Sequence, residues 1–213
     1  LIYVATLGGV FYLPKTNDDN LNSQFIKIPE INSRCYGFFQ KNNSLFIYGL
    51  FGVASYFNNN ITTYSDIQNI LSSGFSSKFH DYVFLGLYNG LAYCKITEHK
   101  LTDFNRIEGI NSLIRFITQD GNGDLWLSTY YSGIIHIKFN SVDIKDYEIT
   151  TYGTEDGLPM LEFNNVLFIN NEIIIATQKG VFQLIADTKK SFKFHPEFMT
   201  ENTPDSIPVN QMI

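Results

Sequence analysis

The sequence predicts an all-β protein, a β-propeller of four-stranded antiparallel blades, from three observations. Aromatic side chains favour strands, and the 213 residues include 19 Phe and 13 Tyr. A short apolar run followed by a glycine recurs five times along the chain. Helical periodicity is almost absent, since only Ile67, Ile70 and Leu71 have helix-like spacing. Repeats of about 40–45 residues with four short strands each are typical of propeller blades.

The recurring glycines set the length of the repeat. They are Gly9, Gly52, Gly90, Gly133 and Gly180, so the intervals are 43, 38, 43 and 47 residues. A small residue precedes each glycine by three or four positions, namely Thr6, Gly49, Gly86, Thr129 and Thr177. The tripeptide Ile-Asn-Ser also occurs at 31–33 and at 110–112, and these copies are 79 residues apart, or about two repeats. These correlated features indicate a structural repeat.

Each copy predicts a β-hairpin whose turn lies just before the glycine. In one example, residues 125–128 form the first strand and residues 134–138 form the returning strand. We expect the glycine to have a positive φ or to permit a close backbone approach. The predicted hairpins are centred on 1–14, 44–57, 81–96, 123–139 and 171–185.

Further strands are predicted on either side of the hairpins. Apolar or alternating runs precede four of them, at 35–39, 75–79, 114–118 and 163–169. More polar runs follow four of them, at 25–28, 61–64, 103–107 and 147–152. Because the connections are short, neighbouring strands are expected to be antiparallel, which gives four strands per repeat.

Two of the predicted strands are apolar on both faces. Residues 82–85 and 173–176 are apolar at consecutive positions, so both faces of these strands must be covered. Parallel sheets cover both faces with helices, but this chain has almost no helical pattern. Sheets stacked face to face around an axis need no helices, which favours a propeller over a sandwich.

The whole chain, 1–213, is predicted to form a single propeller segment with about five visible blades. The chain opens inside a second strand, and SIPVNQMI at 206–213 resembles the entry to a further innermost strand. We therefore expect 186–213 to connect to a further blade. An open arc would leave two blade faces in water, so a larger ring of seven blades is expected. A closed ring of five, in which the terminal pieces complete one blade, is the alternative.

Composition and charge exclude several classes of partner. The net charge of −6 provides no basic surface for nucleic acid or anionic lipid. No run approaches the ~20 apolar residues that cross a bilayer, so no membrane contact is expected from this segment, and no signal peptide is visible. Cys35 and Cys94 lie on different predicted sheets, so two half-buried thiols are expected, with a disulfide as the alternative.

One motif resembles a known family. The string TTYGTEDGLPMLEFNNVLFINNEIIIATQKGVFQL at 150–184 is similar to the two-component regulator propeller repeat, through Asp156-Gly157-Leu158-Pro159 and the hairpin residues Ala176, Thr177 and Gly180. ITQDGNGDLWLSTYYSGIIHI at 117–137 matches the family's Asp-x-x-Gly turn that leads into Leu-Trp-Leu-x-Thr. The resemblance is strong over about 110–185. In other copies, Trp126 is replaced by Phe46, Phe84 and Ile174.

The resemblance implies a signalling function. Propellers of this family form the periplasmic sensing part of membrane-bound hybrid histidine kinases in Bacteroidetes, and many respond to oligosaccharides. It therefore implies a non-catalytic, carbohydrate-sensing extracytoplasmic domain of an inner-membrane protein, with the rest of the sensor kinase as a partner and a homodimer as the parent assembly. The family's kinase and DNA-binding parts are absent here, so no enzyme activity is expected. The alternatives are a structural or dimerising propeller, and a glycoside hydrolase or polysaccharide lyase.

No metal, cofactor or catalytic residue is predicted. The Asp120-Gly-Asn122-Gly-Asp124 segment suggests calcium, but the sixth and twelfth positions of an EF-hand loop are Leu125 and Tyr131 here, so a tight turn is expected. The four histidines have no metal-ligand partner at a suitable interval: His80, His99, His136 and His195. Nucleophile elbows and phosphate-binding loops are absent, and nothing indicates a pair of catalytic carboxylates.

The tips between the second and third strands are the candidate ligand-binding region. In a propeller these tips gather on one face, around the mouth of the central channel. Their aromatic faces suit the C–H faces of sugar rings, and their amides and hydroxyls suit sugar hydroxyls. The alternative is that the aromatic residues pack against adjacent blades or a partner domain. The candidate residues are Phe51, Tyr88, Asn89, Tyr130, Tyr131, Gln178 and Lys179.

Overall fold

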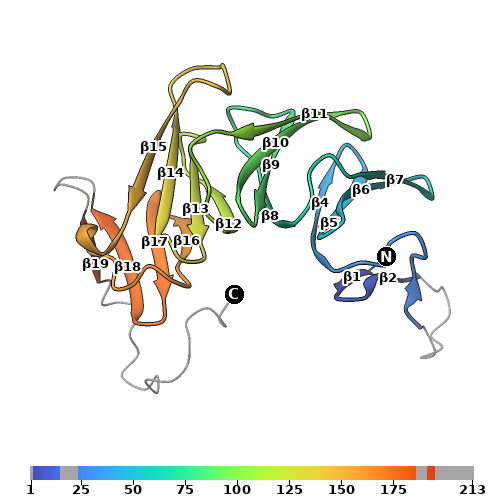
Figure 1. Cartoon of the computed structure of the whole chain (residues 1–213), viewed down its shortest axis with the longest axis horizontal. Helices are drawn as coiled ribbons and strands as arrows, with labels where there is room; N and C mark the ends of the chain where they lie inside the picture. The colour runs from blue at the N-terminus through green and yellow to red at the C-terminus, as the bar shows by residue number, and fades with distance from the viewer. Residues whose placement is uncertain (1, 15–23, 186–190, 195–213) are drawn as a thin grey trace.

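The computed structural model describes residues 2–14, 24–185 and 191–194, and the chain there is almost entirely β. Nineteen strands form five antiparallel sheets, four with four strands and one with three (Figure 1). In every sheet the strands follow one another in sequence order. These radiating meanders confirm the predicted all-β, propeller-like fold.

The strand bounds show the repeat directly. The first sheet contains β1 (Ile2–Thr6), β2 (Gly9–Leu13) and β3 (Ile26–Lys27). The second contains β4 (Cys35–Lys41), β5 (Ser44–Gly49), β6 (Gly52–Phe57) and β7 (Asn60–Tyr64). The third contains β8 (Ile70–Gly74), β9 (Tyr82–Leu87), β10 (Gly90–Thr97) and β11 (Lys100–Ile107). The fourth contains β12 (Ile114–Gln119), β13 (Leu125–Thr129), β14 (Ile134–Phe139) and β15 (Tyr147–Tyr152). After a 3₁₀ turn at Thr154–Asp156, the fifth contains β16 (Asn165–Ile169), β17 (Glu172–Thr177), β18 (Gly180–Ile185) and β19 (Ser191–Phe194).

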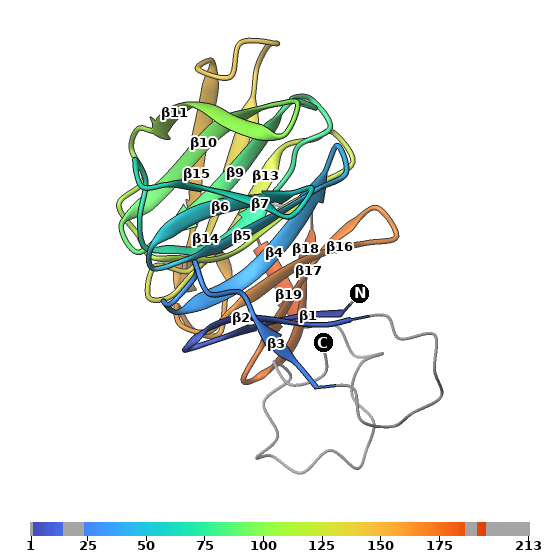
Figure 2. The same ribbon diagram turned by 90° about the vertical axis from the view of Figure 1, so that its right-hand side faces the viewer.

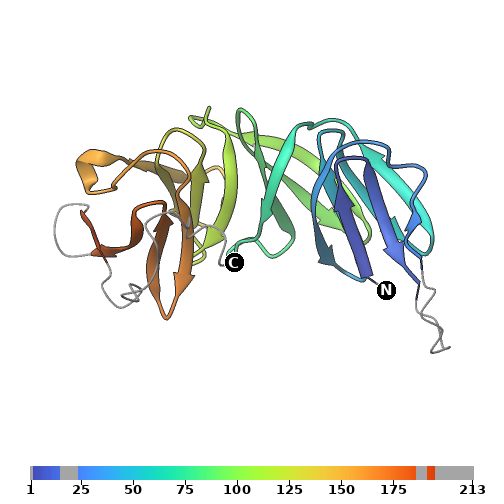
Figure 3. The same cartoon turned by 90° about the horizontal axis from the view of Figure 1, so that it is seen from below.

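The sheets stand side by side in an open arc. Figure 2 shows them one behind another from the N-terminal sheet, and Figure 3 shows them as separate vanes. The first strands β4, β8, β12 and β16 contact one another in that order. They therefore form the inner edge of the arc, and the fourth strands lie outside.

The hydrophobic core lies between the sheets, as four layers. Phe84 and Leu85 are consecutive residues of β9, yet they pack in different layers, Leu85 towards the second sheet and Phe84 towards the fourth. Phe46 and Ile47 of β5 are divided in the same way. All four side chains are fully buried. The consecutive apolar residues of these strands are thus explained by sheets on both sides.

The repeat glycines have the predicted backbone. Gly9, Gly52, Gly90, Gly133 and Gly180 have φ values of 126°, 115°, 130°, 71° and 118°. A Cβ atom at Gly52 would lie 2.8 Å from the carbonyl oxygen of Ile67, and one at Gly90 would lie 2.5 Å from that of Ile110. Both carbonyls belong to the chain entering the next sheet. Glycine is therefore required by conformation and by close approach.

The innermost strand of the third sheet is not where the sequence predicts it. We expect residues 75–79 to form it, but the strand is β8, and Ile70 and Leu71 form part of it rather than of a helix. Ser72, Ser73 and Gly74 are weak strand formers, and packing overrides their propensity. A Cβ atom at Gly74 would lie 2.7 Å from Cβ of Ile117, so a small residue is needed where β8 meets β12.

Three other expectations concern particular segments. The sequence predicts a strand that begins at residue 163, but Phe163 has a φ of 54° and β16 begins at Asn165. Within 186–213, β19 pairs with β18 as a fourth strand, which the sequence does not indicate, whereas 195–213 lies outside the described residues. Cys35 and Cys94 are buried free thiols, and burial raises their pKa values to about 11 and about 12.

Candidate functional site

A hollow of about 440 Å³ lies on the inner part of one face of the arc. It is formed by the first residues of β4, β8 and β12 and by the turns that join β9 to β10 and β13 to β14. Three of the predicted residues, Tyr88, Tyr130 and Tyr131, line it. The other lining residues are Tyr36, Leu71, Leu113 and Arg115.

Backbone hydrogen bonds hold the hairpin tips against the chain entering the inner strands. The amide of Tyr130 donates to the carbonyl of Leu113 (3.0 Å), and the amide of Tyr88 donates to the carbonyl of Asn69 (3.3 Å). The same arrangement recurs in the second sheet, where Leu50 N–H donates to the carbonyl of Arg34 (3.0 Å). The second, third and fourth sheets thus place their tip residues beside the start of an inner strand, as the sequence predicts for propeller tips.

Bulges in the inner strands place the other side chains. The pairing of β4, β8 and β12 with their second strands shifts register once in each case, between Cys35 and Gly37, between Ile70 and Ser72, and between Ile114 and Phe116. The residues within these shifts are Tyr36, Leu71 and Arg115, and all three line the hollow. Bulges redirect side chains and are frequent next to binding sites.

The β13–β14 tip is a tight turn fixed by a threonine. Thr129 Oγ1 donates to the carbonyl of Gly133 (2.8 Å) and accepts from the amide of Ser132 (2.8 Å). The ring of Tyr130 packs edge-on against Tyr131 (4.2 Å between centroids) and Phe163 (4.9 Å). Tyr131 itself is 62% exposed. The tip therefore offers a packed ring beside an exposed one.

Arg115 is the charged group of the hollow. Its guanidinium carbon lies 5.2 Å from the ring centre of Phe116, 5.4 Å from that of Phe163 and 5.8 Å from that of Tyr130. Its Nη1 atom is buried and has no hydrogen-bond partner. Burial lowers the pKa of the guanidinium.

Tyr36 and Tyr88 form the opposite side of the hollow. A hydrogen bond with Tyr36 and a partial loss of hydration raise the pKa of the Tyr88 hydroxyl, and the nearby charge of Arg34 opposes this shift. Tyr88 is 45% exposed and Tyr36 is 36% exposed, so both rings are accessible. Partial loss of hydration, the Tyr130 phenol and the charge of Glu162 raise the pKa of the Tyr131 hydroxyl.

The other predicted residues do not line the hollow. Phe51 packs into the layer between the first and second sheets. The carbonyl and Oδ1 of Asn89 accept hydrogen bonds from Arg106 on β11 (3.0 and 3.1 Å), so Asn89 faces the outer strand. Gln178 and Lys179 form the β17–β18 tip, where the Lys179 amide donates to Thr177 Oγ1 (3.1 Å).

Sequence reasoning missed four lining residues, although one signal was present. Tyr36 and Arg115 each lie five positions after the isoleucine of an Ile-Asn-Ser copy, at Ile31 and Ile110. The repeat therefore assigns them equivalent positions. The shift in register that turns them into the hollow has no comparable sequence signature.

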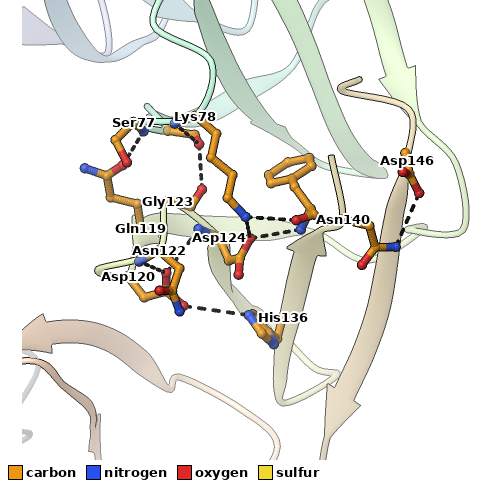
Figure 4. A network of polar contacts seen from close by, with 12 residues as sticks. Ser77, Lys78, Gln119, Asp120, Asn122, Gly123, Asp124, His136, Asn140 and Asp146 are labelled. Carbon is orange, nitrogen blue, oxygen red and sulfur yellow. Dashed lines mark hydrogen bonds and ion pairs between the residues drawn. The ribbon is translucent and has the colours of Figure 1, made fainter. Parts of the chain in front are cut away.

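A second polar cluster lies at the other end of β12 (Figure 4). Asp120 Oδ1 accepts from the amides of Asn122 (2.9 Å) and Asp124 (3.1 Å), and Oδ2 accepts from Trp126 Nε1 (3.1 Å). Asp124 Oδ1 accepts from Lys78 Nζ (2.6 Å) and from the Phe139 amide (2.9 Å). The tight turn expected for this segment is confirmed by the Gly123 amide, which donates to the carbonyl of Asp120 (3.0 Å).

This cluster includes one possible metal-ligand group among the described residues. Potential ligand atoms of Asp120, Asp124 and His136 lie within 4.8 Å of one another, which the spacing of the histidines did not indicate. His136 Nε2 lies 3.9 Å from Asp120 Oδ2, and burial lowers the pKa of His136. The carboxylates already accept N–H donors, and the Lys78 ammonium contacts Asp124. The arrangement is that of a structural network rather than a metal centre.

The segment from 75 to 79 belongs to this network. Ser76 Oγ donates to the carbonyl of Gly123 (2.5 Å), and the Ser77 amide donates to Gln119 Oε1 (2.7 Å). Lys78 also donates to the carbonyl of Phe139 (2.8 Å). The β8–β9 connection is thus hydrogen-bonded to the fourth sheet and its β12–β13 turn. These contacts explain why residues 75–79 form a turn and not the predicted strand.

Comparison with known proteins finds likeness in structure only. No family model matches the chain, and no curated protein matches it. The extracellular domain of BT4673 from B. thetaiotaomicron, described as a hybrid two component system, aligns over 90% of this chain at 20% identity with a TM-score of 0.64. A second structure of that domain, described as a one component system, aligns over 91% at 18% identity with a TM-score of 0.60.

A third solved structure is PorZ, an essential surface component of the type-IX secretion system of Porphyromonas gingivalis. It aligns over 80% of this chain at 10% identity, with a TM-score of 0.55. The aligned region covers 26% of each BT4673 domain and 28% of PorZ, so this chain spans about a quarter of their length. Among the described residues of this chain, no helix is long and apolar enough to cross a bilayer. These likenesses establish a fold shared with part of those larger extracellular and surface proteins.

Proposed function

We propose that this chain is a non-catalytic, extracytoplasmic ligand-sensing propeller of a hybrid two-component signalling system, and that its hollow binds an oligosaccharide. One observation carries the proposal: the aromatic tips of two hairpins and the bulge residues of three inner strands converge on the same open hollow. Its volume of about 440 Å³ is within the range of about 300–1,000 Å³ usual for small-molecule sites.

The chemistry of the lining supports a sugar. Tyr36, Tyr88 and Tyr131 present partly exposed rings, and each ring combines an apolar face with a hydroxyl. Sugar rings have apolar C–H faces that stack on aromatic rings, and hydroxyls that exchange hydrogen bonds with phenols. A shallow, open site suits one or two units of a chain that continues into solvent.

The signalling role is supported by the likeness to the BT4673 extracellular domain. Since this chain spans about a quarter of that domain, the remainder of a sensor kinase is the proposed partner, and a homodimer is the proposed assembly. A ligand changes such an assembly only if it binds one arrangement more tightly than the other. The hollow spans the second, third and fourth sheets, so a ligand there would be sensitive to their relative positions.

The proposal is tested by calorimetry with a panel of oligosaccharides. We expect binding that raises the melting temperature, and about a tenfold loss of affinity in the Tyr130→Ala/Tyr131→Ala double variant, since each lost stacking contact costs about 0.5–1.5 kcal/mol. The matched control is Gln178→Ala/Lys179→Ala, at the equivalent tip of a hairpin that does not line the hollow. Equal affinity in both double variants would contradict the proposed site.

Two other outcomes decide between the alternatives. Absence of binding across the panel would favour a structural or dimerising propeller. Cleavage of the oligosaccharides in the panel, measured as the release of reducing ends, would favour a carbohydrate-active enzyme over a sensor.

A further inference from the structure

Arg115, the one charged residue among the described residues that line the hollow, has a donor that is not satisfied. Its Nη1 atom is buried without a hydrogen-bond partner. The ion pairs between described residues, Lys78 with Asp124 and His136 with Asp120, lie at the other end of β12. A buried donor without a partner is more costly on a charged group than on a neutral one. Such a group requires an explanation.

The guanidinium is held in a fixed position. Phe116, Tyr130 and Phe163 surround it at 5.2–5.8 Å from their ring centres. The bulge between Ile114 and Phe116 sets the direction of its side chain. An arginine positioned by aromatic rings loses little freedom when it binds a ligand, so it is preorganised for one.

The surroundings of the hollow favour a negative ligand despite the net charge of −6. Arg115 lines the hollow, and the charge of Arg34 acts on Tyr88, another lining residue. The charge of Glu162 acts on Tyr131. The two guanidinium groups attract an anion to this part of an acidic protein.

Resting on the proposed function, we propose that the bound oligosaccharide carries a carboxylate and that Arg115 binds it. A planar guanidinium pairs with a planar carboxylate through parallel N–H···O bonds, which is geometry that a neutral sugar hydroxyl cannot reproduce. The ligand is therefore an oligosaccharide that contains a uronic acid. The carboxylate lies at Arg115, and the sugar ring stacks on the neighbouring tyrosines.

The test compares acidic sugars with their own neutral forms. The probes are two oligouronide pools, one of galacturonic and one of glucuronic acid units, and the same pools after their carboxyl groups are reduced to primary alcohols. We expect the reduced pools to bind the full chain about ten- to a hundredfold more weakly, as for a lost charge-assisted hydrogen bond. Arg115→Gln should weaken the acidic pools by the same factor and leave the reduced pools unchanged.

Two further variants make the test specific. Arg115→Lys keeps the charge without the planar fork, so it should recover only part of the lost affinity. Arg106→Gln removes a surface arginine that bonds to Asn89 outside the hollow, and it should leave both affinities unchanged. If Arg115→Gln does not fold, the comparison of acidic and reduced pools with the unmodified protein still decides the matter.

The outcomes separate the two proposals. If acidic and reduced pools bind equally, or if Arg115→Gln keeps the preference for acidic sugars, the carboxylate assignment is wrong and the sugar site stands. If only neutral members of the wider panel bind, the same conclusion holds. If no oligosaccharide binds, the proposed function fails and this inference fails with it.

Discussion

The two ends of β12 differ in how their charged groups are satisfied. At the start of the strand, Arg115 has a buried Nη1 without a partner and opens onto a hollow. Just beyond its other end, Asp120 accepts three N–H groups, and Asp124 contacts both a lysine and a backbone amide. One strand thus serves two purposes, because its paired groups stabilise the fold and its unpaired arginine is left for a ligand.

The paired end also joins two sheets. Lys78 comes from the β8–β9 connection of the third sheet, and Asp124 precedes β13 of the fourth. The ion pair between Lys78 and Asp124 thus lies at the edge of the apolar layer between the third and fourth sheets and links them. The unpaired end lies where three sheets converge, and no ion pair between residues that the structure describes is found there.

The greatest loss of stability is expected when Trp126, which packs at the paired end of β12, is replaced. Trp126 is 3% exposed, stacks on His136 (4.1 Å between centroids) and Tyr152 (5.6 Å), and donates to Asp120. We expect Trp126→Ala to lower the free energy of unfolding by about 3–5 kcal/mol, measured in urea. Trp126→Phe should lose clearly less, since Phe46 and Phe84 stand at the equivalent position of other repeats. A loss below about 1 kcal/mol in the alanine variant would contradict this account.

The next effect isolates the ion pair. Asp124 is 5% exposed, and its removal leaves the Phe139 amide without an acceptor and the Lys78 ammonium with the carbonyl of Phe139 but no carboxylate. We expect Asp124→Ala to cost about 2–4 kcal/mol in urea unfolding.

Combining this change with Lys78→Met tests whether the two groups act together. The Lys78 side chain is 30% exposed, so part of its charge is already screened by water. The double variant should lose less than the sum of the two single losses. Strict additivity would mean that the 2.6 Å contact makes no energetic contribution.

The sequence predicts most of the sheets but not every strand. The repeat glycines predicted the sheets, because positive φ and close approach leave few alternatives to glycine at Gly52 and Gly90. The sequence does not indicate the innermost strand β8, because Ser72, Ser73 and Gly74 are weak strand formers and Gly74 is needed for its small size where β8 meets β12.

The site was predictable only in part, for a similar reason. Tyr88, Tyr130 and Tyr131 follow from the position of hairpin tips in each repeat. Arg115 does not, because its direction depends on a register shift that is set by pairing with β13. The contact between Lys78 and Asp124 joins residues 46 positions apart, and no local pattern indicates it.

The pH dependence of stability tests the environment of His136 at the paired end of β12. Burial lowers the pKa of His136 below its ordinary value near 6.5, so the folded protein takes up a proton less readily than the unfolded chain. Above about pH 6.5 this residue contributes nothing to the pH dependence, and stability should fall as the pH decreases from there to the folded pKa. His136→Gln should show a flatter decline in melting temperature than the unmodified protein between about pH 6.5 and 5. Parallel profiles would contradict a buried, neutral imidazole.

The weakest change in stability is expected at the unpaired end of β12, where Arg115 lies. If Arg115 serves a ligand and not the fold, its removal should cost little. Arg115→Met removes the buried unpaired donor, and the flexible thioether can still pack against Phe116, Tyr130 and Phe163. We expect a change in unfolding free energy within about 1 kcal/mol of zero, with a small gain in stability as readily as a loss. A loss above about 2 kcal/mol would instead make Arg115 a structural residue like Asp124, since a group whose loss destabilises the empty protein is already serving the fold.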